Sequence, residues 1–129
     1  MARDDYHYNE TVLAHIAAPH NTGAMEDADC VGQGFNPACG DEVTLYIKFD
    51  AGAVSDAKME ILGCGAITAA MSSVTDLIRG KSAEEIRQIT HEAISASLGG
   101  LPKHKRHCAQ LAQRVLQNAL KDLEKKTNS

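Results

Sequence analysis

Hydrophobic and polar residues alternate with a period of two in residues 42–49. The apolar positions are Val43, Leu45, Ile47 and Phe49. This period predicts a half-buried β-strand. Turn-forming residues follow at 50–53, and strand-like residues continue over 54–62. The two segments predict a β-hairpin, which brings its first and last residues to the same end of a sheet.

The hydrophobic period becomes helical after the second strand. Apolar residues recur at helical spacings over 66–79, and Gly80 suits the C′ position that follows a helix. Ser82 and Glu85 match a capping box, in which each residue satisfies a backbone N–H of the other. The sequence therefore predicts one helix up to Arg79 and a second, short helix that begins after Ser82.

A last amphipathic helix is expected after the Gly-Gly-Leu-Pro stretch at 99–102. It begins near Lys103 or Arg106 and carries leucine, valine and alanine at spacings of three and four. Such an apolar stripe predicts a helix that packs on the sheet.

The segment before the hairpin divides into a short helix and a long loop. Asn9 is a good N-cap for apolar residues that recur with a helical period, and this helix ends before Pro19. Residues 18–41 contain many glycines, prolines and asparagines, which predicts a long surface loop. Loops of this length in compact domains usually carry function.

Composition narrows the class of protein. The chain has 129 residues, the size of one ordinary domain, and a net charge of −4, which argues against general nucleic-acid binding. No apolar run approaches the ~20 residues that span a bilayer, and the acidic, polar start is unlike a signal peptide. We therefore expect a single cytoplasmic domain over residues 1–129, with no nucleic acid or membrane partner. Its cysteines should remain thiols.

Three of the four cysteines have sequence neighbours that are typical of a metal-binding or reactive thiol and not of a thiol buried in the core. Cys39 lies in Pro-Ala-Cys-Gly-Asp, Cys64 in Gly-Cys-Gly and Cys108 in His-Cys. Thiolates beside glycines, a carboxylate and an imidazole can bind a soft metal. The hairpin should bring Cys39 and Cys64 to the same end, because Cys39 precedes its first strand and Cys64 follows its second.

Two of these cysteines are expected to be acidic. Cys64 immediately precedes a helix, where unsatisfied N–H groups and the helix dipole favour a thiolate. Cys108 lies early in the last helix, and the basic residues just before it favour its thiolate as well. These basic residues are Lys103, Lys105 and Arg106. We expect Cys108 to hold the largest thiolate fraction of the four cysteines.

Asp41 and His107 supply harder ligands beside the thiolates. Oxygen and imidazole hold an iron–sulfur centre less tightly than sulfur does, so a mixed set suits an exchangeable metal. Gly40, Gly63 and Gly65 should let the backbone approach a bulky ligand, and they tolerate positive φ. The remaining histidines are interpreted as surface residues: His7, His15, His20, His91 and His104.

The spacing of the cysteines leaves three kinds of site open. Cys39 and Cys64 are 25 positions apart, Cys64 and Cys108 are 44 apart, and there is no Cys-x-x-Cys pair. These spacings match neither zinc fingers nor ferredoxins. From the residues alone, the candidates are a zinc site, a labile iron–sulfur site and a persulfide-handling thiol enzyme.

Three motifs together resemble a known family over nearly the whole chain. They are Pro-Ala-Cys-Gly-Asp at 37–41, Gly-Cys-Gly-Ala at 63–66 and Leu-Pro-x-x-Lys-x-His-Cys at 101–108. In this order they resemble the iron–sulfur cluster assembly scaffolds of the IscU and NifU N-terminal type. The resemblance implies a small α+β fold with a three-stranded antiparallel sheet packed against helices. Its third strand would lie near 31–35, inside the segment that otherwise predicts a loop.

The resemblance also implies a function and a set of site residues. Cys39, Cys64 and Cys108 would hold a nascent 2Fe-2S cluster built from iron, with Asp41 or His107 completing the site. Cys108 would accept sulfane sulfur from a cysteine desulfurase, and a ferredoxin-type reductant would turn the persulfide into sulfide. Apo-proteins would then receive the cluster. Zinc often occupies the same ligands in such scaffolds.

Two further expectations follow from the resemblance. The chain would act as a scaffold and sulfur acceptor and not as an enzyme, because the transferase chemistry belongs to the desulfurase. Family members dimerise on cluster formation, and Tyr8 falls where they carry an N-terminal tyrosine. We therefore expect a homodimer when the cluster is loaded.

The chain departs from the family pattern at two places. Scaffolds served by a dedicated Hsp70-type chaperone carry Leu-Pro-Pro-Val-Lys, whereas residues 101–105 read Leu-Pro-Lys-His-Lys, which weighs against that partner although Lys105 still matches. Cys30 lies nine residues before Cys39, in the expected loop, and is interpreted as an incidental thiol.

One alternative function belongs to a different class. In a zinc-dependent sulfur-relay protein of the SufU type, zinc is structural and Cys108 only passes persulfide onward. Relay proteins tend to carry arginine where this chain has His107, and they have an insertion between the second and third motifs that is missing here. Both features favour the scaffold.

Overall fold

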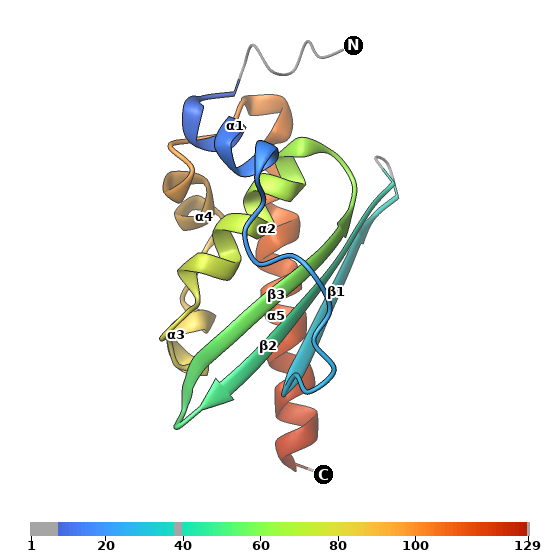
Figure 1. The fold of residues 1–129 in the computed structure, drawn as a ribbon, viewed down its shortest axis with the longest axis vertical. Coiled ribbons are helices and arrows are strands. Elements are labelled where there is room, and N and C mark those ends of the chain that lie inside the picture. Colours follow the sequence, from blue (N-terminus) through green and yellow to red (C-terminus); the bar gives the residue numbers. More distant parts are fainter. Residues whose placement is uncertain (1–7, 38–39, 129) are drawn as a thin grey trace.

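A computed structural model describes residues 8–37 and 40–128 (Figure 1). The strands are β1 (Cys30–Asn36), β2 (Asp41–Asp50) and β3 (Ala53–Leu62). The helices are α1 (Glu10–Ala17), α2 (Gly65–Leu77), α3 (Ala83–Arg87), α4 (His91–Ser97) and α5 (Arg106–Asn128), with a short 3₁₀ helix, η2 (Lys103–Lys105), before α5. The fold is α+β with an antiparallel sheet packed against helices, as the resemblance implied.

The three strands form an antiparallel sheet with β2 in the middle. The predicted hairpin is confirmed, with Glu42 at the start of β2 paired to Leu62 at the end of β3. Alternate β2 side chains enter the core, where Val43, Leu45 and Ile47 are at most 2% exposed. The period of two therefore predicted both the strand and its buried face.

Helix α5 lies along one face of the sheet, behind it in Figure 1. The backbones of β1 and α5 approach closely: a Cβ added at Gly32 would lie 2.3 Å from the Val115 carbonyl oxygen, and one at Gly34 would lie 2.5 Å from the Val115 Cγ2. Only glycine fits at such an approach. The prediction of a loop over 18–41 is therefore wrong for β1, and the strand implied near 31–35 is confirmed.

The rest of the expected loop is tied to the sheet at two points. Thr22 pairs with Met59 at the outer edge of β3, where the Gly23 N–H donates to the Met59 carbonyl at 2.9 Å. The Asp29 N–H donates to the Ile47 carbonyl at 2.8 Å, just before β1 begins. The segment between α1 and β1 therefore runs from one edge of the sheet toward the other.

The predicted helix caps are present, with one shift in position. Asn9 Oδ1 accepts a backbone hydrogen bond from the first turn of α1 at 2.9 Å. Ser82 and Glu85 form the complete capping box of α3. Gly80 has a φ of +80°, but it lies two residues beyond Ile78, the C-cap of α2, and so one position later than expected.

Helix α2 is surrounded by α1, α4, α5 and β3 and is buried around most of its circumference. Small residues allow this close packing, and three buried polar residues join them: Ser72, Ser73 and Thr75. Although α2 is buried, no helix in the described part of the chain is both long enough and apolar enough to cross a membrane.

Candidate functional site

Three segments that are distant in the sequence meet at one end of the sheet, the upper end in Figure 1. β2 begins there with Asp41, α2 begins there after Cys64, and α5 begins there with His107 and Cys108 in its first turn. The hairpin brings the first two together, because the start of β2 pairs with the end of β3. α5 supplies the others because it starts at this end and runs along the sheet.

Asp41 is a buried carboxylate, only 1% exposed. Its Oδ1 accepts a hydrogen bond from the Cys64 N–H at 3.1 Å, and its Oδ2 lies 3.9 Å from the Cys64 Sγ. Gly63 makes room for this carboxylate, since a Cβ there would lie 2.5 Å from Asp41 Oδ1. Burying a carboxylate costs free energy unless the carboxylate is paired or coordinates a metal. The position of Asp41 therefore suits a residue that binds a cation.

Cys64 is the N-cap residue of α2, with an extended backbone at φ −78° and ψ 169°. Its sulfur lies at the start of α2, where the first backbone N–H groups have no partner within the helix. The next residue is Gly65, where a Cβ would lie 2.9 Å from Ile16 Cδ1 of α1. Helix α1 therefore packs on the turn that carries Cys64.

The four described residues that the sequence predicted for the site lie together. The sulfurs of Cys64 and Cys108 are 3.9 Å apart, and His107 Nε2 is 3.6 Å from Cys108 Sγ. Ligand atoms of Asp41, His107 and Cys108 all lie within 4.8 Å of one another. Two sulfurs, one nitrogen and one oxygen form a donor set that suits zinc or iron.

The contact between the two sulfurs makes their acidities unequal. The hydrogen bond from the Cys108 thiol lowers the pKa of Cys64 to about 6, and the backbone N–H of Ile67 and the charge of Lys105 also lower it, while burial and Asp41 oppose this. Donating that hydrogen bond, together with burial, raises the pKa of Cys108. The expectation that Cys108 holds the largest thiolate fraction is therefore wrong. Among the described cysteines, Cys64 does.

Cys39, the remaining predicted ligand, lies outside the described residues, between β1 and β2. The neighbouring glycines differ in backbone conformation. Gly40 has a φ of +70°, as expected, but Gly63 and Gly65 do not have positive φ. The space beside these two is filled by side chains of the protein itself. A side chain at Gly63 would meet Asp41, and one at Gly65 would meet Ile16.

Cys30 is separate from this group. It is the first residue of β1, is 0% exposed and pairs with Ile47. The rest of β1 carries it about 20 Å from the Asn36 end of that strand, at ~3.4 Å per residue. Burial, followed by the charge of Asp122, raises the pKa of Cys30 to about 12. Cys30 lies in a strand and not in a loop, and its position agrees with an incidental thiol.

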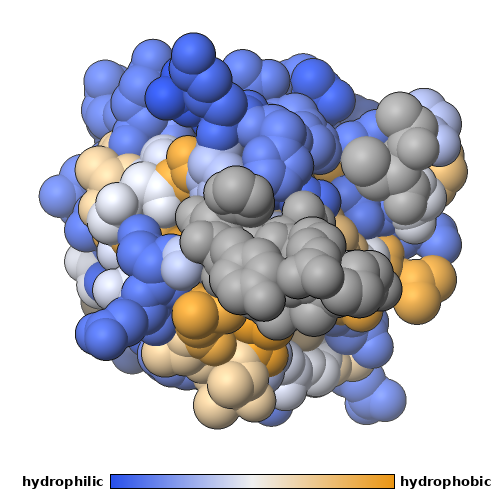
Figure 2. All heavy atoms as spheres, turned by 90° about the horizontal axis from the view of Figure 1, so that it is seen from above, coloured by the Kyte–Doolittle hydropathy of each residue, from blue (hydrophilic) through white to orange (hydrophobic). Residues whose placement is uncertain are grey.

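Apolar side chains are exposed beside the site. Phe35 and Leu62 are 54% and 67% exposed, and both pair with Glu42, so they share the outer face of the sheet. Figure 2 looks down on this end and shows apolar surface (orange) next to hydrophilic surface (blue). A neighbouring hollow is lined by Phe35, Asn36, Pro37, His107, Gln110, Leu111 and Arg114. The sequence analysis missed these exposed apolar residues. Leu62 was a possible signal, because the alternation along β3 would place a polar residue at its position.

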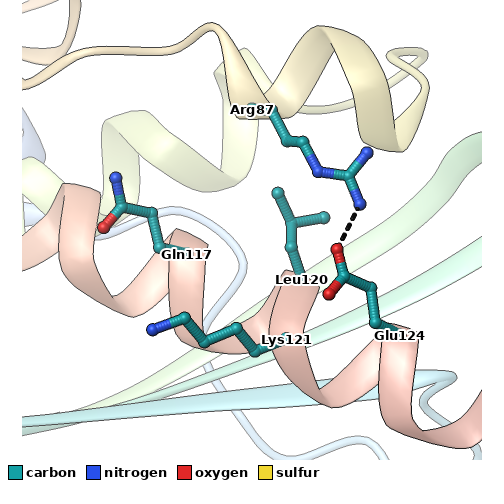
Figure 3. A pocket seen from close by; sticks show the side chains of 5 residues that line it. All are labelled: Arg87, Gln117, Leu120, Lys121 and Glu124. Atoms are coloured by element: carbon teal, nitrogen blue, oxygen red, sulfur yellow. Dashed lines mark hydrogen bonds and ion pairs between the residues drawn. The ribbon is translucent and has the colours of Figure 1, made fainter.

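A second hollow lies between α3 and α5, away from the cysteines (Figure 3). It is lined by Arg87, Gln117, Leu120, Lys121 and Glu124, and Arg87 Nη2 is paired with Glu124 Oε1 at 2.8 Å. Gln117 follows Cys108 on α5 by about 14 Å at ~1.5 Å per residue. None of its lining residues is a cysteine or histidine. This hollow is therefore not part of the candidate metal centre.

The sequence matches proteins whose role has been assigned. Residues 7–129 match the family model described as the NifU-like N terminal domain. The chain is 43% identical over 119 residues to an iron-sulfur cluster assembly scaffold protein IscU of Archaeoglobus fulgidus. The aligned region covers 92% of this chain and 78% of the relative. It is 39% identical over 123 residues to the scaffold protein IscU of Haemophilus influenzae, covering 92% of this chain and 97% of the relative.

Solved structures share the fold. The N-terminal part of a nitrogen-fixing NifU-like protein from Brucella abortus superposes with a TM-score of 0.74 at 22% identity, covering 95% of this chain and 97% of that one. A protein from Fervidobacterium islandicum, assigned as a cluster assembly scaffold for the SUF system, gives a TM-score of 0.68 at 25% identity, with 89% and 97% coverage.

Proposed function

Because the chain belongs to the NifU-like N-terminal domain family, we propose that it is a scaffold on which an iron–sulfur cluster is assembled and then passed to apo-proteins. The observation that supports this most is the meeting of Asp41, Cys64, His107 and Cys108 from three elements at one end of the sheet. The relatives named as IscU scaffolds support the same role.

In this proposal the cluster is cargo, of the 2Fe-2S type. Cys39, Cys64 and Cys108 are its thiolate ligands, and Asp41 or His107 is the fourth. A hard ligand among soft ones holds the cluster less tightly, which a scaffold needs if it is to release its cargo. Zinc takes the same sulfur, nitrogen and oxygen donors, so it can fill the site in place of the cluster.

The proposed sulfur acceptor is Cys108. Its thiolate attacks the outer sulfur of the desulfurase persulfide, a new S–S bond forms, and the desulfurase thiolate leaves. A ferredoxin-type reductant then supplies two electrons, which break that S–S bond and release sulfide. The lowered pKa of Cys64 favours Cys64 as the acceptor in the metal-free protein, so it is the competing assignment.

The proposed partners are proteins. The exposed apolar residues Phe35 and Leu62 beside the site suit docking of a desulfurase or an acceptor. The scaffold itself turns over no substrate, because C–S bond cleavage belongs to the desulfurase. We also propose a homodimer in the cluster-loaded state. Tyr8 is only 8% exposed and packs in the core, so this dimer rests on the family resemblance and not on an exposed tyrosine.

His107 separates the scaffold from the alternative, a zinc-dependent sulfur relay. Its Nε2 lies 3.6 Å from the Cys108 Sγ, where an imidazole can become a metal ligand and an arginine cannot. An imidazole ligand at this place favours an exchangeable site over one in which zinc is only structural.

Anaerobic reconstitution with Fe²⁺, cysteine and a cysteine desulfurase tests the proposal. The absorption spectrum of a 2Fe-2S cluster should develop, and apo-ferredoxin added afterwards should take up that cluster. Size-exclusion chromatography of the loaded protein should show a dimer. Cys30→Ser is the matched control, which should form the cluster normally. A protein that keeps its zinc and accumulates persulfide without a cluster would be a sulfur relay.

A further inference from the structure

A second group of metal-binding side chains lies away from the cysteines. His15 is in the last turn of α1, His20 is in the segment that follows it, and Asp76 is in α2. One ring nitrogen from each histidine and one carboxylate oxygen all lie within 4.8 Å of one another. The sequence analysis interpreted both histidines as ordinary surface residues.

The carboxylate of Asp76 is held in place by its neighbours. Its Oδ2 lies 2.6 Å from His20 Nδ1, and its Oδ1 accepts a hydrogen bond from Asn21 Nδ2 at 3.1 Å. Asn21 is fixed in turn, because Arg79 Nη2 donates to its Oδ1 at 2.7 Å. The contacts of Asn21 and Arg79 are outer hydrogen bonds of the kind that orient the ligands of metal sites in proteins.

One buried hydroxyl positions the two histidines relative to each other. Ser72 is 0% exposed, and its Oγ lies 2.7 Å from His15 Nδ1 while accepting the His20 N–H at 2.8 Å. The two imidazole rings consequently lie close, with their centroids 4.6 Å apart. Two imidazoles and a carboxylate thus share one place on the surface, each with an orienting partner.

We propose that His15, His20 and Asp76 form a second metal site, which binds a divalent ion of borderline softness such as Zn²⁺ or Fe²⁺. Two nitrogens and one carboxylate oxygen are donors that such ions prefer, and the remaining positions go to water. His20 and Asp76 are about half exposed, at 50% and 46% of their side chains, so an ion can enter from solvent.

The second site shares no ligand with the cysteine site. Both touch α2, but Asp76 follows Cys64 by twelve positions, which corresponds to about 18 Å along a helix at ~1.5 Å per residue. An ion at His15, His20 and Asp76 therefore binds independently of the cargo at the cysteines. The proposal does not depend on the scaffold function.

Cobalt titration of a cysteine-depleted chain tests the site. In the full chain carrying Cys39→Ser, Cys64→Ser and Cys108→Ser, Co²⁺ should bind with one ion per chain. It should give visible d–d absorption without the sulfur-to-cobalt charge-transfer band of a thiolate site. Adding Asp76→Asn, or His20→Asn, should weaken Co²⁺ affinity at least about tenfold, the loss typical when a metal site is damaged.

His91 provides the matched control. Its Nε2 lies 3.5 Å from Glu92 Oε1, so it is a partly exposed histidine beside a carboxylate, like His20. It belongs to neither group of metal-binding side chains found in the described part of the chain. His91→Asn should therefore leave Co²⁺ affinity unchanged. An equal loss in this variant would mean that the ion binds any exposed histidine–carboxylate pair, and would overturn the site.

If the serine variants unfold, nuclear magnetic resonance of the unmodified chain tests the same site. After one equivalent of Zn²⁺ has filled the cysteines, a second equivalent should shift the imidazole signals of His15 and His20 and leave those of His91 in place. Absence of that shift, or Co²⁺ binding that survives Asp76→Asn in the folded chain, would overturn the proposal. A failed cluster reconstitution would leave this result standing.

Discussion

Cys30 begins β1 and Cys64 precedes α2, and the two residues lie toward opposite ends of the same sheet. Their thiols behave in opposite ways. Burial raises the pKa of Cys30 to about 12, whereas the hydrogen bond from Cys108 lowers the pKa of Cys64 to about 6. One residue type is thus a buried, weakly acidic thiol at one end and an acidic thiol at the other.

Exposure alone does not explain this difference. Cys108 is 0% exposed, like Cys30, yet it lies with Cys64 at the end of the candidate metal centre. The two ends differ in the groups that surround the sulfur. At one end these are a second sulfur, an imidazole and a carboxylate. At the other end they are apolar side chains, with Asp122 and Lys126 nearby. The comparison teaches that the neighbours of a thiol decide its chemistry.

The largest expected effect is in thiol reactivity of the metal-free protein. At pH 7 Cys64 should be mostly thiolate and Cys30 almost entirely thiol. Even with the lower nucleophilicity of the more acidic thiolate, their alkylation rates should differ by about 100-fold or more. Alkylation by iodoacetamide, followed by peptide mass spectrometry, should label Cys64 ahead of Cys30 and Cys108, the other two cysteines that the structure describes. Its rate should fall below pH 6, where the thiolate is protonated, and level off above pH 7.

Two results would break the comparison between the two ends. Labelling of Cys30 at a rate near that of Cys64 would show that burial does not protect it. Labelling of Cys108 ahead of Cys64 would show that the thiolate of the pair resides on Cys108 instead.

The next largest effect concerns cluster formation. Cys64→Ser should lower the amount of cluster formed in reconstitution at least about tenfold, since loss of a ligand exceeds the loss seen for supporting residues. Cys30→Ser should form the cluster normally, because its side chain lies ~20 Å from the Asn36 end of β1. Iron and sulfide analysis of both variants measures this. Equal losses would contradict the separation of the two ends.

A smaller effect is expected on the free energy of unfolding. Here the substitution of Cys30 should have the larger effect and that of Cys64 the smaller. Cys30→Ser places a hydroxyl in an apolar setting and should cost about 1–3 kcal/mol of the free energy of unfolding. The metal-free Cys64→Ser variant should lose less, because Cys64 is only partly buried. Urea denaturation of both metal-free proteins measures the difference, and a larger loss in Cys64→Ser would be unexpected.

The smallest effect tests the carboxylate at the site. The negative charge of Asp41 raises the pKa of Cys64, so Asp41→Asn should lower that pKa further, by less than about one unit. The pH midpoint of Cys64 alkylation should therefore move to lower pH. A shift to higher pH would mean that the hydrogen bond between Asp41 and the Cys64 N–H matters more for the thiolate than the charge does.

Local patterns predicted most of the fold. The hairpin, the Asn9 cap and the capping box of α3 depend on residues that are close in the sequence, and all three are present. β1 could not be predicted from local pattern, because Gly32 and Gly34 are required by the backbone and side chain of Val115. That contact joins residues from distant parts of the chain, and only the family resemblance indicated a strand there.

The candidate site was predictable in its residues but not in its energetics. The flanking residues identified Asp41, Cys64 and Cys108, and these lie together. The relative acidity of the two thiols depends on a distance of 3.9 Å between sulfurs on different helices, which the sequence does not contain. The cluster of His15 with Asp76 was missed for the same reason, since helices α1 and α2 meet only in the folded chain.

The packing of α5 on β1 has a consequence for the growing chain. Asn118 Nδ2 on α5 donates to the Gln33 carbonyl on β1, and the two residues are 85 positions apart in the sequence. β1 therefore leaves the ribosome long before α5, the helix that packs on it. Cys64 likewise emerges 44 positions ahead of Cys108, the thiol that does most to lower its pKa. Until α5 docks, Cys64 lacks the neighbour that makes it a strong thiolate. The low pKa of Cys64 is therefore a property of the folded chain and not of the nascent one.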